Sequence, residues 1–339
     1  TSFFNSQLPI IFGKPTILRS SDVTTIGFDI IGTIFFILSG YEDAVKKEAD
    51  RHGRLPFKST ITSEFSLITR PIVDEYIDLL WTIILEIEPS LCRKERSSKV
   101  SISCDVDVPY SFYVKSFWSA IRTVGGDLIK RKSLPSAIQT ITNFVMSKLN
   151  IYFFDPVNKF DWMMDVNESF GHRTAFNFIS GKSNLEMDGH YSLDEKRIRE
   201  LIKRIHDRGH EIGLHASYDS CLNPEQISSE AAKLRSVLLE EKVEQPIIGS
   251  RQHYLKFSRL KTFRYLELAG ITYDSTVSFA EHAGFRCGTA RSFTMYDLEN
   301  KKSLVIRQKP LIVMESSLLS SEYMGMKDTE KIISYIVDL

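Results

Sequence analysis

Acidic side chains that could do metal or acid–base chemistry follow an apolar, strand-like segment of this chain. Asp105 and Asp107 come after the segment that ends at Ser103, and their spacing of two points both carboxylates to one side of an extended chain. Two adjacent carboxylates repel each other unless a proton or a cation lies between them. The pair therefore predicts a divalent-metal site, with an N-cap or Asx-turn pair as the structural alternative.

A histidine follows another strand-like segment. His215 comes directly after Leu214, and a neutral imidazole at this position can bind zinc or a similar metal. Asp219 lies four residues further on and can return to the same ion if the segment turns. A structural histidine at the end of a strand is the alternative interpretation of His215.

A dense polar group follows the next strand-like segment, which ends at Gly249. Arg251 can orient a carboxylate through its forked donors. His253 can bind a metal, act as a general acid or bind a sugar hydroxyl, and a loop salt bridge is the structural alternative for this group. Asp274 and Glu315 follow two later segments of the same kind.

Strand and helix patterns alternate through the part of the chain that carries these residues. Ser192 and Glu195 can form a capping box that opens one helix. Asn223 opens another as its N-cap, with Pro224 in the first turn. Further helices are predicted at 70–88 and 260–268. Apolar runs predict short strands at 100–103, 174–178, 211–214, 246–249, 271–273, 304–306 and 311–314.

Repeated strand–helix units imply parallel strands joined by right-handed crossovers, which leaves an α/β barrel or a doubly wound sheet. In an α/β barrel the carboxyl ends of the strands meet at one mouth, where such folds place their chemistry. The sequence contains neither GxGxxG nor GxxxxGK[ST], so nucleotide-binding versions of these folds lose support.

Composition narrows the class of protein. The 339 residues include 43 basic and 43 acidic side chains, so net charge gives no reason to expect nucleic acid as a partner. Four scattered cysteines argue against a disulfide framework, and no apolar run reaches the ~20 residues of a transmembrane helix. A cytoplasmic protein is expected, with export left open because the chain does not begin with Met. Two domains are expected, at 1–95 and 100–339, joined by a basic, Ser-rich linker.

Four motifs together resemble those of the polysaccharide deacetylases. They are SCDVDVP at 103–109, GHEIGLH at 209–215, GSRQHY at 249–254 and GITYDS at 270–275. The second motif is the most specific, and the resemblance covers residues 100–339. The opening 95 residues resemble the uncharacterised domain that precedes the deacetylase domain in some bacterial proteins. The resemblance implies a distorted (β/α)7-type barrel, preceded by a smaller N-terminal α/β domain.

The resemblance also implies roles for the polar residues. Asp105 is the general base and Asp107 a metal ligand, although one residue separates them here and the order can be reversed. His215 matches the first metal-binding histidine, and Asp219 stands where the family has its second. Either Asp219 binds the metal, or His253 substitutes for it, or metal binding is weakened.

Further roles follow from the later motifs. Arg251 matches the arginine that orients the catalytic aspartate, and Asp274 is assigned a catalytic role. Tyr254 and Glu315 are assigned to substrate contact. The family uses a late histidine as general acid, but none follows Glu315. Unless the protein continues beyond the last residue, either His253 supplies the acid or activity is lost.

The expected function is a hydrolase that removes acetyl groups from an N-acetylated or O-acetylated sugar or polysaccharide. One divalent ion is expected, with zinc first and cobalt, nickel or manganese as alternatives. A non-catalytic carbohydrate-binding or scaffold protein and a metal phosphoesterase are the alternative functions. The exact substrate and the oligomeric state are not predicted.

Overall fold

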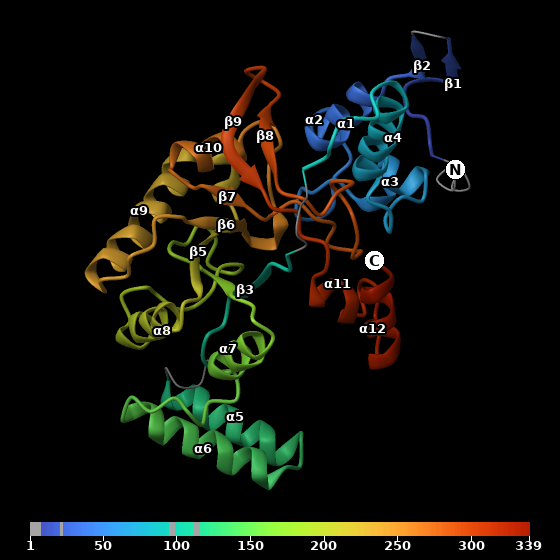
Figure 1. Ribbon diagram of the computed structural model, residues 1–339. Helices are drawn as coiled ribbons and strands as arrows, with labels where there is room; N and C mark the ends of the chain where they lie inside the picture. Colours follow the sequence, from blue (N-terminus) through green and yellow to red (C-terminus); the bar gives the residue numbers. More distant parts are fainter. Residues whose placement is uncertain (1–7, 21–22, 95–98, 112–115) are drawn as a thin grey trace. The chain divides into compact units, whose positions relative to one another are not determined.

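Parallel strands organise residues 99–253, one of the two units into which the chain divides in this computed structural model (Figure 1). The strands pair in the order β3, β4, β5 and β6. The elements of this unit are β3 (Ile102–Val106), α5 (Phe117–Ile129), α6 (Leu134–Lys148), α7 (Phe160–Ser169), β4 (Thr174–Phe178), α8 (Lys196–Asp207), β5 (Glu211–Ala216), η4 (Ser220–Leu222), α9 (Pro224–Glu240) and β6 (Gly249–Gln252). The structure describes residues 8–20, 23–94, 99–111 and 116–339, so residues 95–98 of the expected linker lie outside it.

The helix α9 begins where the sequence predicts. The side chain of Asn223 caps it by accepting the amide N–H of Gln226 at 3.0 Å, and Pro224 occupies the first turn, where no donor is lost. Its buried face is mostly apolar, with Ile227, Ala231, Leu234, Val237 and Leu238. At this helix the capping residue and the apolar periodicity therefore both match the structure.

The helix α8 begins later than the expected capping box. Glu195 takes the N-cap position, and helical residues start at Lys196. The Glu195 carboxylate accepts the amide N–H of Ser192 at 3.1 Å, so half of the box forms in the turn before the helix. The expected apolar face is present and buried, with Ile198, Leu201, Ile202 and Ile205.

The strands β3, β5 and β6 end later than their apolar residues indicate, and β6 begins only at Gly249, the last residue of the strand expected at 246–249. Asp105 lies inside β3, opposite Asn177 of β4. His215 lies inside β5, opposite Arg251 of β6. The strands continue because a parallel neighbour satisfies the backbone N–H and C=O groups whatever the side chain. The expectation that these three polar residues follow their strands is therefore corrected, since they project from the last residues of the sheet.

Residues 1–98 and 254–339 form the other unit. Its elements are β1 (Gly13–Arg19), β2 (Thr24–Phe28), α1 (Ile30–Leu38), α2 (Tyr41–Val45), η2 (Phe57–Ser59), α3 (Ile61–Glu64), α4 (Ile72–Ile87), α10 (Thr262–Leu268), β7 (Tyr273–Asp274), β8 (Phe293–Asp297), β9 (Lys302–Gln308), α11 (Glu315–Leu319) and α12 (Thr329–Asp338). β1 pairs antiparallel with β2, while β9 pairs parallel with β7 and antiparallel with β8. A buried apolar cluster packs together segments of residues 28–76 of this unit and contains Phe28, Ile30, Leu67, Ile72 and Tyr76.

The expected strand at 311–314 does not form. These residues are irregular and lead into α11, which begins at Glu315. Their backbone makes isolated bonds instead of a ladder, such as the 2.7 Å bond from Gly284 N–H to the Ile312 carbonyl. Pro310, directly before them, also lacks an amide donor. The antiparallel strand β8 was not predicted from the sequence.

Arg259 joins two distant parts of the second unit. Its Nη2 donates to the Leu38 carbonyl at 2.6 Å and its Nε donates to the Ser39 carbonyl, so a buried guanidinium caps the C-terminal end of α1. Gly40 follows with a φ of 60°, and a Cβ there would lie 2.5 Å from the Arg259 Nε. Only glycine adopts this backbone conformation without strain and leaves room for the guanidinium.

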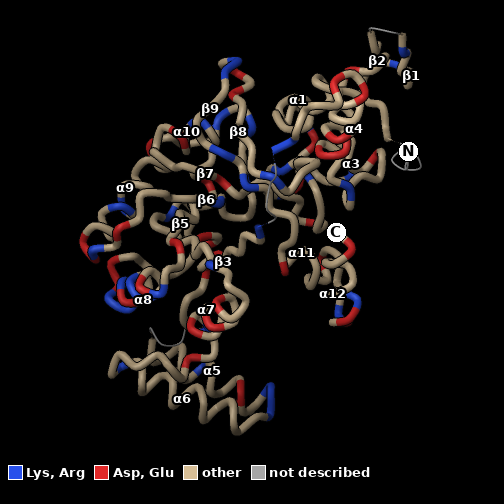
Figure 2. The backbone as a smooth tube through the Cα atoms, in the orientation of Figure 1, with Lys and Arg blue, Asp and Glu red and all other residues tan. Residues whose placement is uncertain are grey.

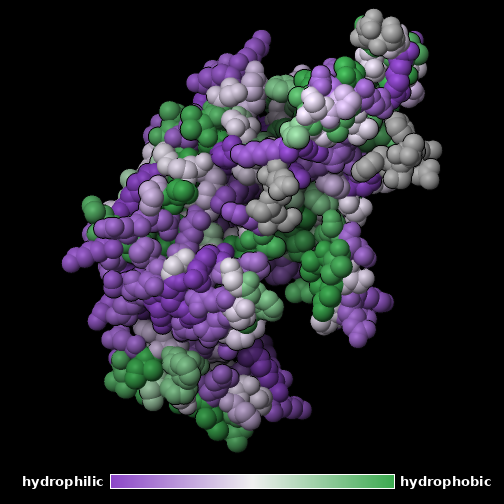
Figure 3. All heavy atoms as spheres, viewed as in Figure 1, coloured by the Kyte–Doolittle hydropathy of each residue, from purple (hydrophilic) through white to green (hydrophobic). Residues whose placement is uncertain are grey.

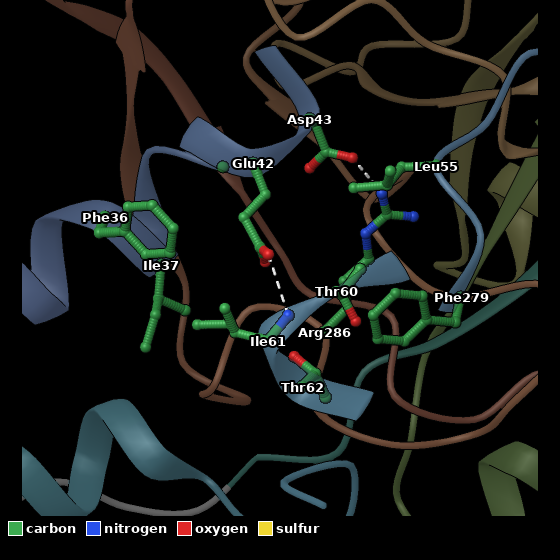
Figure 4. Close-up of a pocket in the computed structure, with 11 residues that line it drawn as sticks. Phe36, Ile37, Glu42, Asp43, Leu55, Thr60, Ile61, Thr62, Phe279 and Arg286 are labelled. Carbon is green, nitrogen blue, oxygen red and sulfur yellow. Dashed lines mark hydrogen bonds and ion pairs between the residues drawn. The ribbon is translucent and has the colours of Figure 1, made fainter. Parts of the chain in front are cut away.

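A small pocket in the same unit lies among α1, α2, α3 and residues 279–286 (Figure 4). Its charged side chains are paired with one another or with nearby groups. Arg286 forms an ion pair with Asp43. Glu42 binds Lys46 at 2.7 Å and accepts the Ile61 amide N–H at 2.9 Å. We interpret these contacts as packing between the segments and assign the pocket no ligand.

The paired strands and intervening helices establish an α/β fold with mostly parallel strand pairing, as expected. Closure into a (β/α)7-type barrel stays a prediction, and so does the division into domains at 1–95 and 100–339. Within the described residues, no helix has the length and apolar character needed to cross a bilayer.

Replacing Gly40 by alanine should destabilise the protein by about 2–3 kcal/mol, because positive-φ strain adds to displacement of Arg259. Gly53→Ala is a matched control, because its φ is 77° and a Cβ there meets nothing within 4 Å. The control should lose only the strain energy, about 1 kcal/mol. Chemical denaturation measures both losses, and equal losses would show that the close approach to Arg259 has no energetic importance.

Candidate metal centre

Three potential metal ligands converge at the carboxyl ends of β3, β5 and β6. Asp107 follows β3, His215 lies in β5, and His253 follows β6. Their ligand atoms all lie within 4.8 Å of one another. The Asp107 Oδ1 is 3.3 Å from the His215 Nε2 and 3.6 Å from the His253 Nε2. The structure therefore brings together three residues that are far apart in the sequence.

Hydrogen bonds at the opposite ring nitrogens fix both imidazoles. The His215 Nδ1 donates to the Arg251 carbonyl at 2.9 Å. The His253 Nδ1 donates to the Asp188 Oδ1 at 3.1 Å. With a proton on each Nδ1, each Nε2 lone pair is directed toward Asp107 when the ring is neutral. This is the arrangement that metal-binding histidines adopt in proteins.

The donor set fits a divalent transition metal. The Asp107 Oδ1 is buried and accepts no hydrogen bond, which is costly for a carboxylate oxygen without a nearby cation or proton. Two imidazole nitrogens and one carboxylate oxygen are ligands that suit zinc and its neighbours. Asp107, His215 and His253 could therefore hold such an ion.

Electrostatics at the centre favour a positive charge. Burial disfavours the charged form of Asp107, but His215 and His253 outweigh it, so the pKa of Asp107 lies below its ordinary value. Burial also disfavours protonated His215, but the carboxylates of Asp105 and Asp107 outweigh it and raise the pKa of that imidazole. A metal ion would replace the proton on His215, so metal binding should release protons.

Asp105 is held by two donors beside the three ligands. The Asn177 Nδ2 donates to its Oδ1 at 2.8 Å, and the Arg251 Nη1 lies 3.4 Å from both of its oxygens. Burial disfavours ionisation, but Arg251 and then His215 and the Asn177 hydrogen bond outweigh it, so the pKa of Asp105 is lowered. Arg251 thus contacts Asp105, the aspartate that the family resemblance implies it orients.

Gly213 makes room for the group that holds Asp105. It lies opposite Asn177 in the ladder between β4 and β5. A Cβ at Gly213 would lie 2.1 Å from the Asn177 Oδ1. The glycine inside the GHEIGLH motif therefore has a physical purpose, since any larger residue would displace the Asn177 amide.

Asp188 is a site residue that the sequence analysis missed. It is almost completely buried in the irregular segment between β4 and α8. Besides His253, it accepts the amide N–H groups of Ser183 and Asn184 at 2.8 Å and of Tyr218 at 2.7 Å. Burial opposes its ionisation, but these bonds outweigh it and lower its pKa to about 2. No strand end or helical spacing in the sequence marks Asp188.

Asp219 lies outside the group of three. It precedes η4, where its carboxylate accepts a hydrogen bond from the Asn184 Nδ2 at 3.1 Å. Its amide N–H donates to the Ser183 Oγ at 2.7 Å. Of the alternatives left by the sequence, the geometry favours His253 over Asp219 as the ligand that completes the centre.

The remaining expected site residues belong to the other unit. Both carboxylate oxygens of Asp274 accept bonds at 2.7 Å from the N–H and Oγ–H of Thr276, an Asx-type turn. The Tyr254 ring packs against the His52 ring, with centroids 4.8 Å apart. Glu315 is exposed at the start of α11. The catalytic role of Asp274 and the substrate roles of Tyr254 and Glu315 stay predictions.

A shallow hollow lies beside Asp107 in the 99–253 unit. Its wall includes Tyr110, His190 and Arg197. The Arg197 guanidinium lies over the rings of Tyr110 and Tyr152, at 5.1 and 5.4 Å from their centroids. The hollow thus offers polar and aromatic groups directly beside Asp107.

His253→Ala should lower zinc affinity at least about tenfold, because it removes a ligand, whereas Asp219→Asn should leave the affinity unchanged. Titration of the metal-free protein with zinc or cobalt, followed by calorimetry, measures both. The opposite order would restore Asp219 as the ligand.

Asp188→Asn should weaken zinc affinity about 10- to 100-fold, because the His253 imidazole loses its anionic partner while keeping its metal-facing nitrogen. Asp194→Asn is the control, since Asp194 is an exposed acid that pairs with Lys233. The same calorimetric titration applies. Unchanged affinity in Asp188→Asn would limit Asp188 to holding the backbone of its loop.

Gly213→Ala should destabilise the protein by about 1–3 kcal/mol, because the added methyl group displaces Asn177 from Asp105. Gly126→Ala in α5 is the control, since a Cβ there meets nothing within 4 Å. It should be neutral or stabilising by up to about 1 kcal/mol, since alanine favours helix. Urea denaturation distinguishes the two, and a neutral Gly213→Ala would contradict the packing argument.

Comparisons with known proteins found one matching family model and one similar solved structure. Residues 2–89, in the part expected to be an uncharacterised domain, match a family of unknown function, DUF7033. No curated protein matches the chain. A solved structure from Mycobacterium smegmatis, provisionally described as a polysaccharide deacetylase, is similar over 62% of this chain, with a TM-score of 0.35 and 15% sequence identity. The match covers 57% of that protein, so the chain spans little more than half of its length.

Proposed function

We propose that this chain is a metal-dependent hydrolase that removes acetyl groups from an acetylated sugar or polysaccharide. The observation that carries the proposal is the Asp107, His215 and His253 group, with Asp105 and Arg251 beside it. The motif resemblance supplies the acetylated sugar as the substrate class. The group itself supports hydrolysis at a metal centre.

A divalent ion held by these residues would polarise the acetyl carbonyl and lower the pKa of a bound water. Two imidazole ligands favour zinc, with cobalt, nickel or manganese as alternatives. The ring orientations needed for binding already exist, because Arg251 and Asp188 hold the two Nδ1 atoms. Little reorganisation of the protein is therefore required.

Asp105 is the proposed general base. Its lowered pKa keeps the carboxylate ionised near neutral pH, so it can accept a proton from an attacking water. Arg251 and Asn177 fix the carboxylate, and the Arg251 Nη2 is itself held by the Ser103 Oγ at 2.8 Å. These contacts set the direction in which Asp105 receives the proton.

Asp105 is also the proposed general acid. The sequence left His253 as one candidate for this role, but an Nε2 lone pair that binds a metal cannot also carry a transferable proton. After accepting a proton, Asp105 can return it to the leaving amine or alcohol of the sugar. One carboxylate would then act in both steps, with Tyr110 and Arg197 in the adjacent hollow available to contact the sugar.

The test combines metal content with acetate release from acetylated chito-oligosaccharides. His215→Ala should lose both the metal and the activity. Asp105→Asn should keep the metal but lose at least about a hundredfold in rate, because proton transfer fails. Asp194→Asn is the control for removing an exposed carboxylate.

Four results would contradict the proposal. The first is that the parent protein binds no metal after incubation with zinc, cobalt or nickel. The second is that the Asp105→Asn variant releases acetate as fast as the parent protein. Hydrolysis of p-nitrophenyl phosphate without acetate release would instead support a metal phosphoesterase, and metal binding without either activity would support a non-catalytic carbohydrate-binding protein.

A further inference from the structure

The helix α6 has the reverse of the usual polarity. Its buried residues are small or polar, namely Ala137, Thr140, Asn143 and Ser147. An apolar stripe with spacings of three and four residues faces outward, and each member is at least 50% exposed: Leu134, Ile138, Ile141, Val145 and Leu149. The hydrophobic effect favours the opposite arrangement in water. The stripe is therefore a surface suited to apolar surroundings.

Polar contacts with α5 hold the reversed face inside. Asp127 of α5 is buried, and its Oδ2 accepts a hydrogen bond from the Thr140 Oγ1 at 2.8 Å. Its Oδ1 accepts a bond from the Arg131 Nη1 at 2.6 Å. Turning α6 to bury the stripe against α5 would break the Thr140 bond and expose the Asp127 site. The packing of α5 against α6, called here the α5–α6 hairpin, thus keeps the apolar stripe on the outside.

Large exposed side chains extend this apolar face, and Figure 3 shows hydrophobic side chains over the hairpin. On α5 the exposed residues include Phe117, Trp118, Ile121 and Ile129. Trp118 is 75% exposed, and Phe153 in the segment after α6 is 82% exposed. Tryptophan rings prefer the boundary between water and lipid.

The charge of the hairpin indicates what covers it. Residues 116–149 contain one acidic side chain, the buried Asp127, and five basic ones, Arg122, Lys130, Arg131, Lys132 and Lys148. Figure 2 shows basic residues at the connection between α5 and α6. Pairing with a second copy of the hairpin would bring like charges together. Anionic lipid headgroups would attract them.

We propose that the α5–α6 hairpin binds in the plane of an anionic membrane surface. Its apolar stripe would enter the boundary of the acyl chains, while its lysines and arginines contact the headgroups. The two helices have 13 and 15 residues, short of the ~20 that a membrane span needs, so the hairpin lies on the bilayer. This inference goes beyond the proposed hydrolase activity and does not depend on it.

The test measures co-sedimentation of the full chain with vesicles of phosphatidylglycerol and phosphatidylcholine, and with phosphatidylcholine alone. The parent should bind the anionic vesicles, and Ile138→Gln with Ile141→Gln should lower the partition coefficient at least about tenfold. Leu239→Gln is the matched control, because Leu239 is 80% exposed on α9, outside the hairpin. Lys130→Gln with Lys132→Gln should reduce the preference for anionic vesicles.

Fluorescence gives a second readout that does not depend on a polar substitution. Vesicles with brominated acyl chains should quench the tryptophan fluorescence of the parent protein. The Trp118→Leu variant keeps an apolar side chain, so it should still bind the vesicles, but its fluorescence should be quenched less because the Trp118 contribution is gone. Failure of the parent to bind anionic vesicles would overturn the proposal, as would equal binding by the stripe variant and the Leu239→Gln control. A parent dimer that the stripe variant converts to a monomer, without vesicle binding, would assign the face to a second copy of the chain.

Discussion

The candidate metal centre depends on one buried carboxylate oxygen. The Asp107 Oδ1 faces the Nε2 atoms of His215 and His253 and accepts no hydrogen bond. Burying such an oxygen costs free energy unless a proton or a cation lies close to it. Neither imidazole can turn away without losing the acceptor at its Nδ1. The surrounding contacts therefore preserve a position for positive charge.

The parallel strands set the directions of the groups around this oxygen. Pairing of β5 with β6 places His215 opposite Arg251, so the carbonyl of one residue can orient the imidazole of the other. Pairing of β3 with β4 places Asp105 opposite Asn177 in the same way. A register shift of one residue would send these side chains to the other face of the sheet. The geometry of the candidate centre thus depends on strand register as much as on residue type.

Polar groups also determine how apolar surface is distributed elsewhere. In α6, the Asp127–Thr140 bond keeps a polar face inside and leaves the apolar stripe outside. In the other unit, the buried Arg259 guanidinium caps α1 and requires glycine at position 40. In both places a buried polar contact restricts the packing, because breaking it would remove a hydrogen-bond partner from a buried charged group. Hydrophobic pattern alone would not predict either arrangement.

Local features of this protein can be predicted from its sequence alone. Helical spacing identified the faces of α8 and α9, Asn223 marked a helix start, and the acids and histidines near strand ends indicated a candidate site. These signals are local, because a cap or a periodic face involves residues a few positions apart. Tertiary contacts bring His253, and not Asp219, close to Asp107 and His215, and they place Asp188 against the His253 ring. Those contacts join residues 35 or more positions apart, so their geometry depends on how the strands and the loop between β4 and α8 come together.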